Sequence, residues 1–501
     1  MIIADVLRKW STSTKIAAIE NKRKVTYKDL YSQCIEKSSI IKSANFNSGE
    51  IGILINNSID YIVAYFTIAF IGKIIVPIDP NTKKTELLKI IDNCNIKMII
   101  TNDKNYDNLI TLVSSFEEKI VLFNISNNNF LRFGKNYDYN QKKDYKKIYS
   151  SDSIALILGT SGTNNNPKRV ALSNKNLISN VKSIIHSLKI KEDDISLISL
   201  PIYLASANTS QFLTHFFLGG QIVIMEGLFF PNKFMEMVEK YKITNFTGIP
   251  FMMNVLFDYN YHNNFNIDSL RYMCFGGGTL SNEIYLKMNL NYPKVSIIKM
   301  YGLTEASARV SHLIINNKNM NKLNSVGKTI LGVMVKVVNE EGNELTTGDI
   351  GEIIVNGNNV MRGYHNNKEL SEKVLQNDWL HTGDIGKIDE DGYIYILGRK
   401  KNVIISCGYN IHPEEIEEVL LDHPHVKEAY VYGIEDSLYD EVPVLEIVPD
   451  GDSNLSKSEL FSYIKQNLSF YKIPKEIKFV SSINKTSSGK IKRVRQNQKI
   501  N

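Results

Sequence analysis

The chain of 501 residues has a composition that excludes several classes of protein. Hydrophobic residues make up 43% and charged residues 22%, which is typical of a globular protein and excludes wholesale disorder. A net charge of +6 over this length is too weak to indicate a nucleic-acid partner. The most apolar stretch, 61–76, contains Lys73 and is too short for a transmembrane segment, and we find no signal peptide. The four cysteines form no CxxC pair, so we expect reduced thiols and a cytoplasmic location.

Short apolar runs alternate with helical patterns in the first part of the chain. This alternation predicts βαβ units and parallel sheets. The elements it predicts are strands at 51–55, 97–101 and 154–158 and helices at 60–72 and 84–94. Asn-rich runs, which favour turns, predict loops at 127–129, 164–166 and 316–324.

The pattern changes after about residue 332, where strand-like segments dominate. The segment 333–345 predicts a strand, a turn at Gly342 and a second strand, and 351–357 and 392–398 continue the β-rich pattern. A mixed pattern follows, with predicted helices at 413–421 and 457–468 and strands at 428–433 and 443–448. We therefore predict an α/β protein with layered N-terminal subdomains and a β-rich subdomain in 1–400, and a small α+β C-terminal domain in 401–501.

A segment rich in Gly, Thr and Ser follows the strand predicted at 154–158. Glycine permits positive φ, successive N–H groups form an anion nest, and hydroxyl groups add donors, which suits phosphate. Lys168 adds a cation at the rim, although the GxxxxGK[ST] pattern is absent. The alternative is a polar surface turn. The residues of this predicted phosphate loop are Thr160, Ser161, Gly162 and Thr163.

Two further segments place polar groups after apolar runs. In 298–307, Tyr301 suits stacking on a base, Thr304 can donate to phosphate and Glu305 can bind Mg²⁺; the alternative is a helix capped by Thr304. Upstream, Gly276, Gly277 and Gly278 would let the backbone approach a ligand closely.

Two more candidates lie nearer the C-terminus. Asp384, between two glycines in WLHTGDIG, is suited to accept hydrogen bonds from a ribose diol, with a turn aspartate as the alternative. Lys490 follows a flexible SSG in NKTSSGKIKR, where solvated basic surface is the alternative.

In this order, together with 397–417, the segments resemble the adenylate-forming superfamily of acyl-CoA synthetases, nonribosomal adenylation domains and luciferase-like ligases. The resemblance runs from 56–80 to the Lys490 motif, through 423–436 and 471–480. It implies that a carboxylate attacks the α-phosphate of ATP and releases pyrophosphate. The implied contacts are the phosphate loop on the β- and γ-phosphates, Thr304 on the α-phosphate, Glu305 on Mg²⁺, Tyr301 stacked on adenine, Gly276–Gly278 close to the base and the acyl group, Asp384 on the ribose hydroxyls aided by Arg399, and Lys490 on both reacting anions.

The resemblance also implies a second half-reaction, in which a thiol takes the acyl group. The small C-terminal domain would rotate about Lys401 and bring Ser406, Gly408 and Tyr409 to line a tunnel for CoA or for the phosphopantetheine of a carrier protein. A plain linker is the alternative for Lys401, and Cys407 is expected to be a small loop residue.

The sequence departs from the family at three places, one of which is 326–332, VGKTILG, where the usual glycine–proline pair after VG is absent. Asn164, Asn165 and Arg169 replace the usual Thr, Gly and Gly of the phosphate loop, which puts its phosphate contacts in doubt. Leu204 and Ala207 replace the usual His and Gly of the acyl-pocket motif, which puts substrate entry in doubt.

The expected substrate is a small aryl or short-to-medium acyl acid. No aspartate lies between 200 and 213 to pair with an α-ammonium, which disfavours an amino acid. Arg309 would either bind a second carboxylate or lie at the surface. The expected pocket residues are Tyr203, Ala205, Asn208, Thr209, Phe212, Gly278, Ala306 and Arg309.

Three functions remain open: a carboxylate–CoA ligase, a stand-alone ligase that loads an acyl or peptidyl carrier protein, and a degenerate nucleotide-binding protein. Lys465, Lys472, Lys475 and Lys478 would form a basic patch suited to an acidic carrier. We expect a monomer or homodimer.

Overall fold

The structure of this chain is a computed structural model. It describes residues 1–44, 49–114, 120–133, 150–160, 168–258, 265–277, 282–316, 318–406, 409–436, 440–451, 455–468, 472–485, 491 and 493. Among these residues no helix has the length and apolar character needed to cross a membrane.

An eight-stranded sheet built mainly from the N-terminal third has the order β19-β9-β8-β4-β3-β5-β6-β7. Its centre is parallel, because helices α3 (Ile59–Phe70), α4 (Lys84–Asn93) and α5 (Asp103–Val113) connect successive strands. The chain begins with α1 (Ile3–Arg8) and α2 (Tyr27–Ser43). The strands are β3 (Glu50–Ile53), β4 (Ile74–Pro77), β5 (Met98–Thr101), β6 (Ile120–Asn124), β7 (Asn129–Phe133), β8 (Ile154–Gly159), β9 (Arg169–Ser173) and β19 (Gly363–Tyr364).

A nine-stranded sheet has the order β16-β15-β14-β13-β12-β10-β11-β1-β2 and a parallel centre from β11 to β14. Its strands are β1 (Ile16–Glu20), β2 (Arg23–Thr26), β10 (Ile195–Ile198), β11 (Gln221–Ile224), β12 (Asn245–Gly248), β13 (Tyr272–Gly276), β14 (Ser296–Tyr301), β15 (Ser311–Ile314) and β16 (Lys328–Thr329). Its helices are α6 (Asn174–Leu188), α7 (Ala205–Ala207), the π-helix η1 (Asn208–Leu213), α8 (Thr214–Leu218), α9 (Pro231–Tyr241), α10 (Pro250–Asp258) and α11 (Asn282–Asn291).

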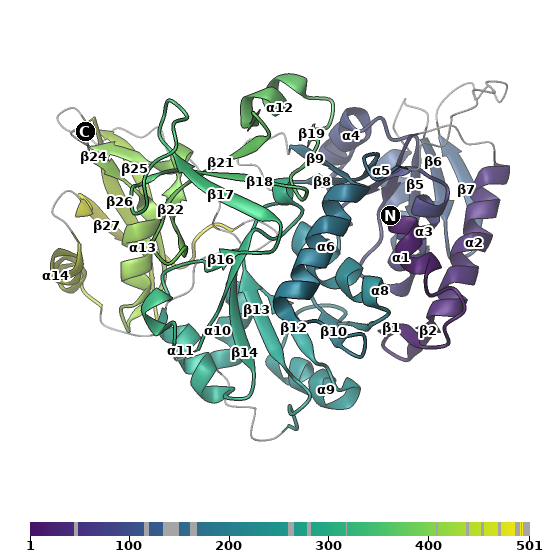
Figure 1. Cartoon of the computed structure of the whole chain (residues 1–501), viewed down its shortest axis with the longest axis horizontal. Coiled ribbons are helices and arrows are strands. Elements are labelled where there is room, and N and C mark those ends of the chain that lie inside the picture. The colour runs from purple at the N-terminus through teal and green to yellow at the C-terminus, as the bar shows by residue number, and fades with distance from the viewer. Residues whose placement is uncertain are drawn as a thin grey trace.

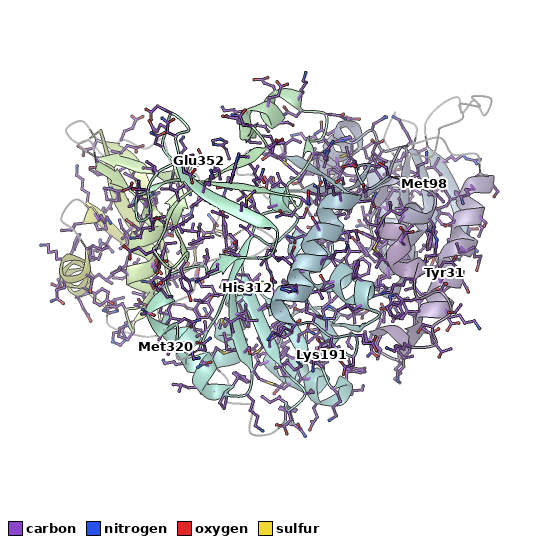
Figure 2. The ribbon with its side chains drawn as sticks, viewed as in Figure 1. Tyr31, Met98, Lys191, His312, Met320 and Glu352 are labelled. Atoms are coloured by element: carbon purple, nitrogen blue, oxygen red, sulfur yellow. The ribbon has the colours of Figure 1, made fainter. Side chains whose placement is uncertain are left out.

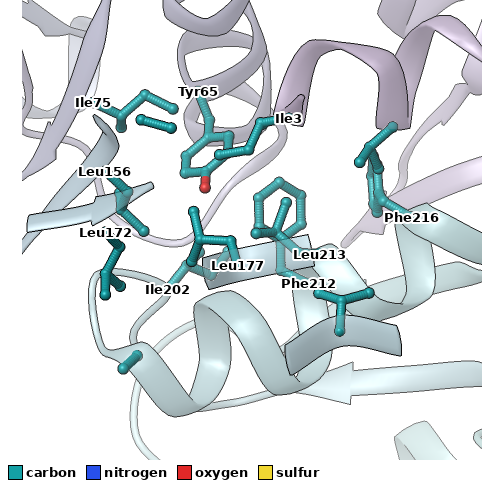
Figure 3. Close-up of a cluster of buried hydrophobic side chains, with 14 of the residues drawn as sticks. Ile3, Tyr65, Ile75, Leu156, Leu172, Leu177, Ile202, Phe212, Leu213 and Phe216 are labelled. Carbon is teal, nitrogen blue, oxygen red and sulfur yellow. The ribbon is translucent and has the colours of Figure 1, made fainter. Parts of the chain in front are cut away.

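The largest hydrophobic core joins these two sheets. It takes Leu156 and Leu172 from one sheet, Cys274 and Ile298 from the other, and Leu177 from α6, which lies between them (Figure 1). Figure 3 shows Tyr65 of α3 facing Phe212 of η1 in this core, with ring centroids 5.1 Å apart in an edge-to-face arrangement.

Two five-stranded sheets complete the fold and lie toward the C-terminal side of the molecule (Figure 1). The first contains β17 (Val333–Val338), β18 (Gly351–Gly357), β20 (Leu375–Gln376), β21 (Trp379–Ile388) and β22 (Ile394–Arg399), beside α12 (Lys368–Val374). The second contains β23 (Ile404–Ser406), β24 (Tyr409–Ile411), β25 (Val426–Asp436), β26 (Asp440–Pro449) and β27 (Glu476–Phe479), with α13 (Pro413–Leu421) and α14 (Lys457–Asn467).

The predicted fold class, a layered α/β chain with a smaller C-terminal part, is confirmed. The boundary between residues 400 and 401 stays a prediction. One predicted element is wrong, because the strand expected after Gly342 is only an isolated bridge between Val338 and Glu344. The turn alternative for Asp384 is also wrong, because this residue lies inside the ten-residue strand β21.

Candidate active site

Several predicted residues meet where strands of two sheets end or bend. Tyr301 is the last residue of β14, and Gly276 ends the neighbouring parallel strand β13. Asp384 and Arg399 are cross-strand partners on β21 and β22. Ligands of open α/β sheets bind at such carboxyl ends, so these side chains mark one candidate site.

The carboxylate of Asp384 is the centre of a three-residue group. The Tyr301 hydroxyl donates to Oδ2 at 2.5 Å, and Arg399 Nε lies 2.5 Å from Oδ1. Asp384 is only 3% exposed, and burial raises the pKa of its carboxyl group while the Arg399 guanidinium opposes that shift. The arrangement fixes the direction of both the carboxylate and the tyrosine ring.

A bulge in β21 aims Asp384 into this group. The register against β18 shifts just before Asp384, and Gly383 has a φ of +71°, which favours glycine. Glu352 of β18 accepts a bond from the Gly383 N–H at 3.0 Å, and Thr382 Oγ1 accepts one from the Asp384 N–H at 3.0 Å. Figure 2 labels Glu352 on its strand. The sequence analysis missed Glu352 and Thr382, because nothing in their local pattern sets them apart.

A second group links Glu305 to the predicted phosphate loop. The hydroxyl of Tyr364, on β19, donates to Glu305 Oε1 at 2.9 Å, and Lys168 Nζ lies 3.5 Å from the same hydroxyl. The loop begins at Thr160, whose N–H donates to the Lys168 carbonyl at 3.0 Å. Ser161, Gly162, Thr163, Asn164 and Asn165 lie outside the described residues. Tyr364 had no distinguishing signal in the sequence.

The segment between β14 and β15 folds back on itself and carries Thr304 and Glu305. Both lie in the 3₁₀ turn η3 (Thr304–Ala306), whose cap is Leu303, so the alternative that Thr304 caps a helix is wrong. The Val310 N–H donates to the Tyr301 carbonyl at 3.0 Å and closes this loop. A Cβ on Gly302 would lie 1.7 Å from the Ala308 carbonyl oxygen, so only glycine fits there.

Arg169, which replaces a family glycine, lies beneath the phosphate loop. It is 8% exposed, its Nη1 lies 2.7 Å from where a Cβ on Gly159 would stand, and its Nε has no hydrogen-bond partner. The substitution therefore adds a buried cation at the base of the loop.

Most of the expected pocket residues are buried, in α7 and η1 except for Ala306, which lies in η3. Ala205 is 9% exposed, and Asn208, Thr209, Phe212 and Ala306 are all 0% exposed. Asn208 Nδ2 and Thr209 Oγ1 have no hydrogen-bond partners, and π-helices often occur at functional sites. Phe212 packs within the aromatic core (Figure 3), whereas Tyr203 interacts with Asp79. Gly278 lies outside the described residues.

Arg309 is not at the surface, so that alternative is wrong. Its side chain is 2% exposed and lies against sulfur atoms of Met300 and Cys274. Its Nη1 has no hydrogen-bond partner, and no described carboxylate lies within ion-pair distance of the guanidinium. Burying a charge without a counter-ion costs several kcal/mol.

The C-terminal candidates are only partly described. Lys401 lies in the 3₁₀ turn η5 (Lys400–Asn402), and Ser406, 8% exposed, ends β23. Tyr409 begins β24, while Gly408, Cys407 and Lys490 lie outside the described residues. Three residues after Lys490, Arg493 Nη1 donates to Glu417 Oε1 at 2.9 Å and its Nη2 donates to Oε2 at 2.5 Å. This bidentate pair ties the end of the chain to α13.

Glu305 can hold a magnesium ion only if the phosphate oxygens of a bound nucleotide supply further metal ligands. The described residues contain no cluster of three acidic, histidine or cysteine side chains. Glu305 has one oxygen bonded to Tyr364, so the other can coordinate a cation. Mg²⁺ is commonly held by one or two carboxylates plus substrate phosphates, which matches a single glutamate.

Comparisons with known proteins agree over most of the chain. The sequence profile of the AMP-binding enzyme family matches residues 8–365, and that of the AMP-binding enzyme C-terminal domain matches 415–490. The chain is 29% identical to a 4-coumarate–CoA ligase of Vanilla planifolia, over 88% of this chain and 82% of that one. It is 31% identical to a feruloyl-CoA synthase of an Amycolatopsis species, over 68% of each chain.

A solved structure is similar along the full length. The o-succinylbenzoate CoA synthetase from Bacillus subtilis, in complex with its acyl-adenylate intermediate, superposes with a TM-score of 0.84 at 25% identity and covers 99% of both chains. The same enzyme in complex with ATP and a magnesium ion gives a TM-score of 0.83 at 26% identity, over 97% of this chain and 98% of that one.

Proposed function

The chain belongs to the AMP-binding enzymes and is an acid–thiol ligase of the acyl-CoA synthetase type, and from this premise we propose its substrate class and the roles of its residues. The predicted resemblance to adenylate-forming enzymes is confirmed. We propose that the chain transfers the AMP part of ATP to a small aryl or short-to-medium acyl acid, with release of pyrophosphate, and then transfers the acyl group from AMP to CoA.

The group around Asp384 carries this proposal, because it suits a nucleoside. Each carboxylate oxygen of Asp384 accepts one bond, from Tyr301 or Arg399, and retains acceptor capacity for a ribose hydroxyl. The Arg399 guanidinium opposes the rise in the pKa of Asp384 that burial causes and so favours the ionised carboxylate, to which hydrogen bonds are stronger. The Tyr301 ring, held by its hydroxyl, would stack on adenine beside Gly276 and Gly277.

The second group suits the phosphates of ATP. Thr304 would contact the α-phosphate, and Thr160, Ser161, Gly162, Thr163 and Lys168 would hold the β- and γ-phosphates. Glu305, oriented by Tyr364, would hold Mg²⁺, which supplies positive charge for the phosphate oxygens.

The chemistry of the first step needs positioning rather than a base. An oxygen of the substrate carboxylate bonds to the α-phosphorus of ATP, and the bond to the pyrophosphate oxygen breaks. The carboxylate is already a nucleophile, so no proton must be removed. Lys490 would reduce the repulsion between the two anions, and Arg493 would hold the segment that carries it.

In the second step a thiol sulfur attacks the acyl carbon of the adenylate and AMP leaves. We propose that Lys401 is the hinge for this change and that Ser406, Gly408 and Tyr409 line the thiol path. Three of the four lysines expected to attract a carrier protein pair with acids, Lys472 with Glu415, Lys475 with Asp436 and Lys478 with Glu476. Because these pairs reduce the basic patch, we favour CoA over a carrier protein as the acceptor.

An acid panel tests the proposal. We expect pyrophosphate release from ATP that depends on both the carboxylic acid and Mg²⁺, followed by thioester formation when CoA is added. If a thioester forms only with a phosphopantetheinylated carrier protein, the acceptor is that carrier protein and not CoA. Nucleotide binding without acid-dependent pyrophosphate release for any acid would contradict the proposed activity and favour a degenerate nucleotide-binding protein.

A further inference from the structure

The structure points to a second acidic group on the substrate, and we propose that Arg309 binds it. The preferred acid is then a dicarboxylate, with one carboxylate at the reacting centre and the other buried against β13 and β14. This inference rests on the proposed function, because it concerns the acid that the same site would activate.

Arg309 has no counter-ion among the described residues, unlike Arg271, Arg399 and Arg493. The described residues bury only two arginines below 9% exposure, Arg169 and Arg309, and neither has a carboxylate within ion-pair distance. Arg169 lies at the base of the phosphate loop, where ATP would supply negative charge. Arg309 lies outside that loop, so it needs a different anion.

The atoms around the Arg309 guanidinium do not replace an anion. Its neighbours Met300 and Cys274 offer sulfur, a weak acceptor, and burial raises the pKa of the Cys274 thiol, so the thiol is neutral. The Nη1 group has no hydrogen-bond partner at all. Nδ1 of His312, a residue labelled in Figure 2, also lacks a partner. Met300 contacts the Arg309 guanidinium and is the cross-strand partner of His312, so both side chains lie at Met300.

The fold fixes Arg309 where the loop that carries Thr304 and Glu305 returns to the sheet. Its backbone is fixed to Asn180 of α6, whose Nδ2 donates to the Arg309 carbonyl at 2.8 Å. Its guanidinium lies against Cys274, two residues before Gly276 on the same strand face. At the spacing of a β-strand, two residues correspond to roughly 7 Å. The guanidinium thus lies about one such repeat from Gly276, which we expect close to the base and the acyl group. A second carboxylate at Arg309 therefore suits an acid whose two ends are separated by an aromatic ring or a short alkyl chain.

The chemistry of this arrangement discriminates between acids. Guanidinium does not lose its proton in proteins, so Arg309 is charged whether or not a partner is present. A carboxylate can accept two parallel N–H bonds from it, whereas the apolar end of a monoacid leaves the charge buried and unpaired. The site therefore favours a diacid over the monoacid of the same shape.

Matched acid pairs test this inference on the wild-type enzyme. We expect kcat/KM for pyrophosphate release to be at least tenfold higher for adipate than for hexanoate, or for 4-carboxycinnamate than for cinnamate. Equal or better use of both monoacids would overturn the role of Arg309 while leaving the proposed ligase function intact. If no acid supports pyrophosphate release, the ligase function itself is contradicted, and the inference about Arg309 is contradicted with it.

Variants assign the preference to Arg309. Arg309→Met should lower kcat/KM for the diacid about a hundredfold and leave or improve that of the monoacid, while Arg309→Lys should retain part of the diacid preference. Arg362→Met removes an exposed arginine nearby and should affect both acids alike. An equal fall in kcat/KM for the diacid and the monoacid in a folded Arg309→Met protein would overturn the inference. If that variant fails to fold, the wild-type pairs and Arg309→Lys still decide.

Discussion

Asp384 shows how this chain supports a buried carboxylate at the site that we propose for the nucleotide. The carboxylate is 3% exposed, yet it has Arg399 as counter-ion and Tyr301 as donor. These partners occupy one bond on each oxygen and leave room for more. Arg399 and Tyr301 thus stabilise the buried carboxylate when no ligand is bound, and each oxygen can still accept a hydrogen bond from a hydroxyl group.

We expect Asp384→Asn to weaken ATP use strongly. The amide removes the charge that Arg399 and a ribose diol would share, and bonds to charged groups contribute about 1.5–3 kcal/mol each, so kcat/KM for ATP should fall roughly 100-fold. Pyrophosphate release at varied ATP measures this. Asp391→Asn is the control, because Asp391 lies beyond the same strand with a side chain 64% exposed, and it should change little. An unchanged KM for ATP in Asp384→Asn would contradict the assignment.

Among single residues, the sequence predicted the side chains expected to contact the nucleotide and the metal ion but not the residues that hold those side chains in place. Asp384, Glu305 and Arg399 stand in recognisable motifs, whereas Tyr364 and Glu352 act through contacts with residues 59 and 31 positions away. Contacts over such separations leave no local pattern. The fate of Arg309 was also open, because burial of a charged side chain depends on tertiary packing.

At the scale of elements, the loop between β14 and β15 is the most constrained part of the site. Ser307 and Ala308 have φ of 58° and 102°, and the Ala308 carbonyl lies against Gly302. Backbone strain of this kind persists only where the surrounding structure fixes it, and it is common at ligand sites. The loop carries Thr304 and Glu305 at its tip and Arg309 on its return.

Gly302→Ala should displace this loop. Its Cβ would lie 1.7 Å from a backbone oxygen, so the loop must move, and we expect a loss of about 1–3 kcal/mol in the free energy of unfolding together with loss of adenylation. Urea unfolding and pyrophosphate release measure the two effects. Gly49→Ala, where a Cβ meets nothing within 4 Å, is the control and should leave both unchanged. Wild-type activity in Gly302→Ala would contradict the close contact between residue 302 and the Ala308 carbonyl oxygen.

Regular elements were predictable, and irregular ones were not. Periodicity and Pro413 predicted helix α13 with its observed bounds, and the apolar runs predicted β3 and β5 closely. The π-helix η1 and the bulge in β21 follow from packing between layers, which a single sequence does not encode locally. The phosphate-loop tip lies outside the described residues, so its departures from the family stay a prediction.

For the whole molecule, burial of histidines makes stability depend on pH. Burial, aided by the Arg309 charge, lowers the pKa of His312 from 6.5 to about 3, and burial also lowers the pKa of His215. Below pH 6.5 the unfolded chain therefore binds more protons at these residues than the folded chain does. The contribution of His312 to stability is complete above that pH and is lost as the pH falls toward 3, and the contribution of His215 changes in the same direction.

His312→Gln should reduce this acid sensitivity. Between about pH 8 and about pH 5, wild-type protein should lose on the order of 1–2 kcal/mol more of its free energy of unfolding than the variant does. Urea unfolding at both pH values measures the difference, and His215 remains in both proteins as a constant background. An equal loss in the two proteins would contradict a depressed pKa at His312.

For the enzyme as a whole, the central expectation is that one chain first makes an acyl-adenylate and then a thioester. Mass spectrometry of single-turnover mixtures tests this most directly, with the Lys490→Ala variant beside the wild type. We predict acyl-AMP and pyrophosphate when CoA is withheld, and acyl-CoA and AMP when it is supplied. Lys490→Ala should form no adenylate, yet should convert supplied acyl-AMP to acyl-CoA. Formation of ADP and phosphate, or equal loss of both steps in the variant, would contradict the account.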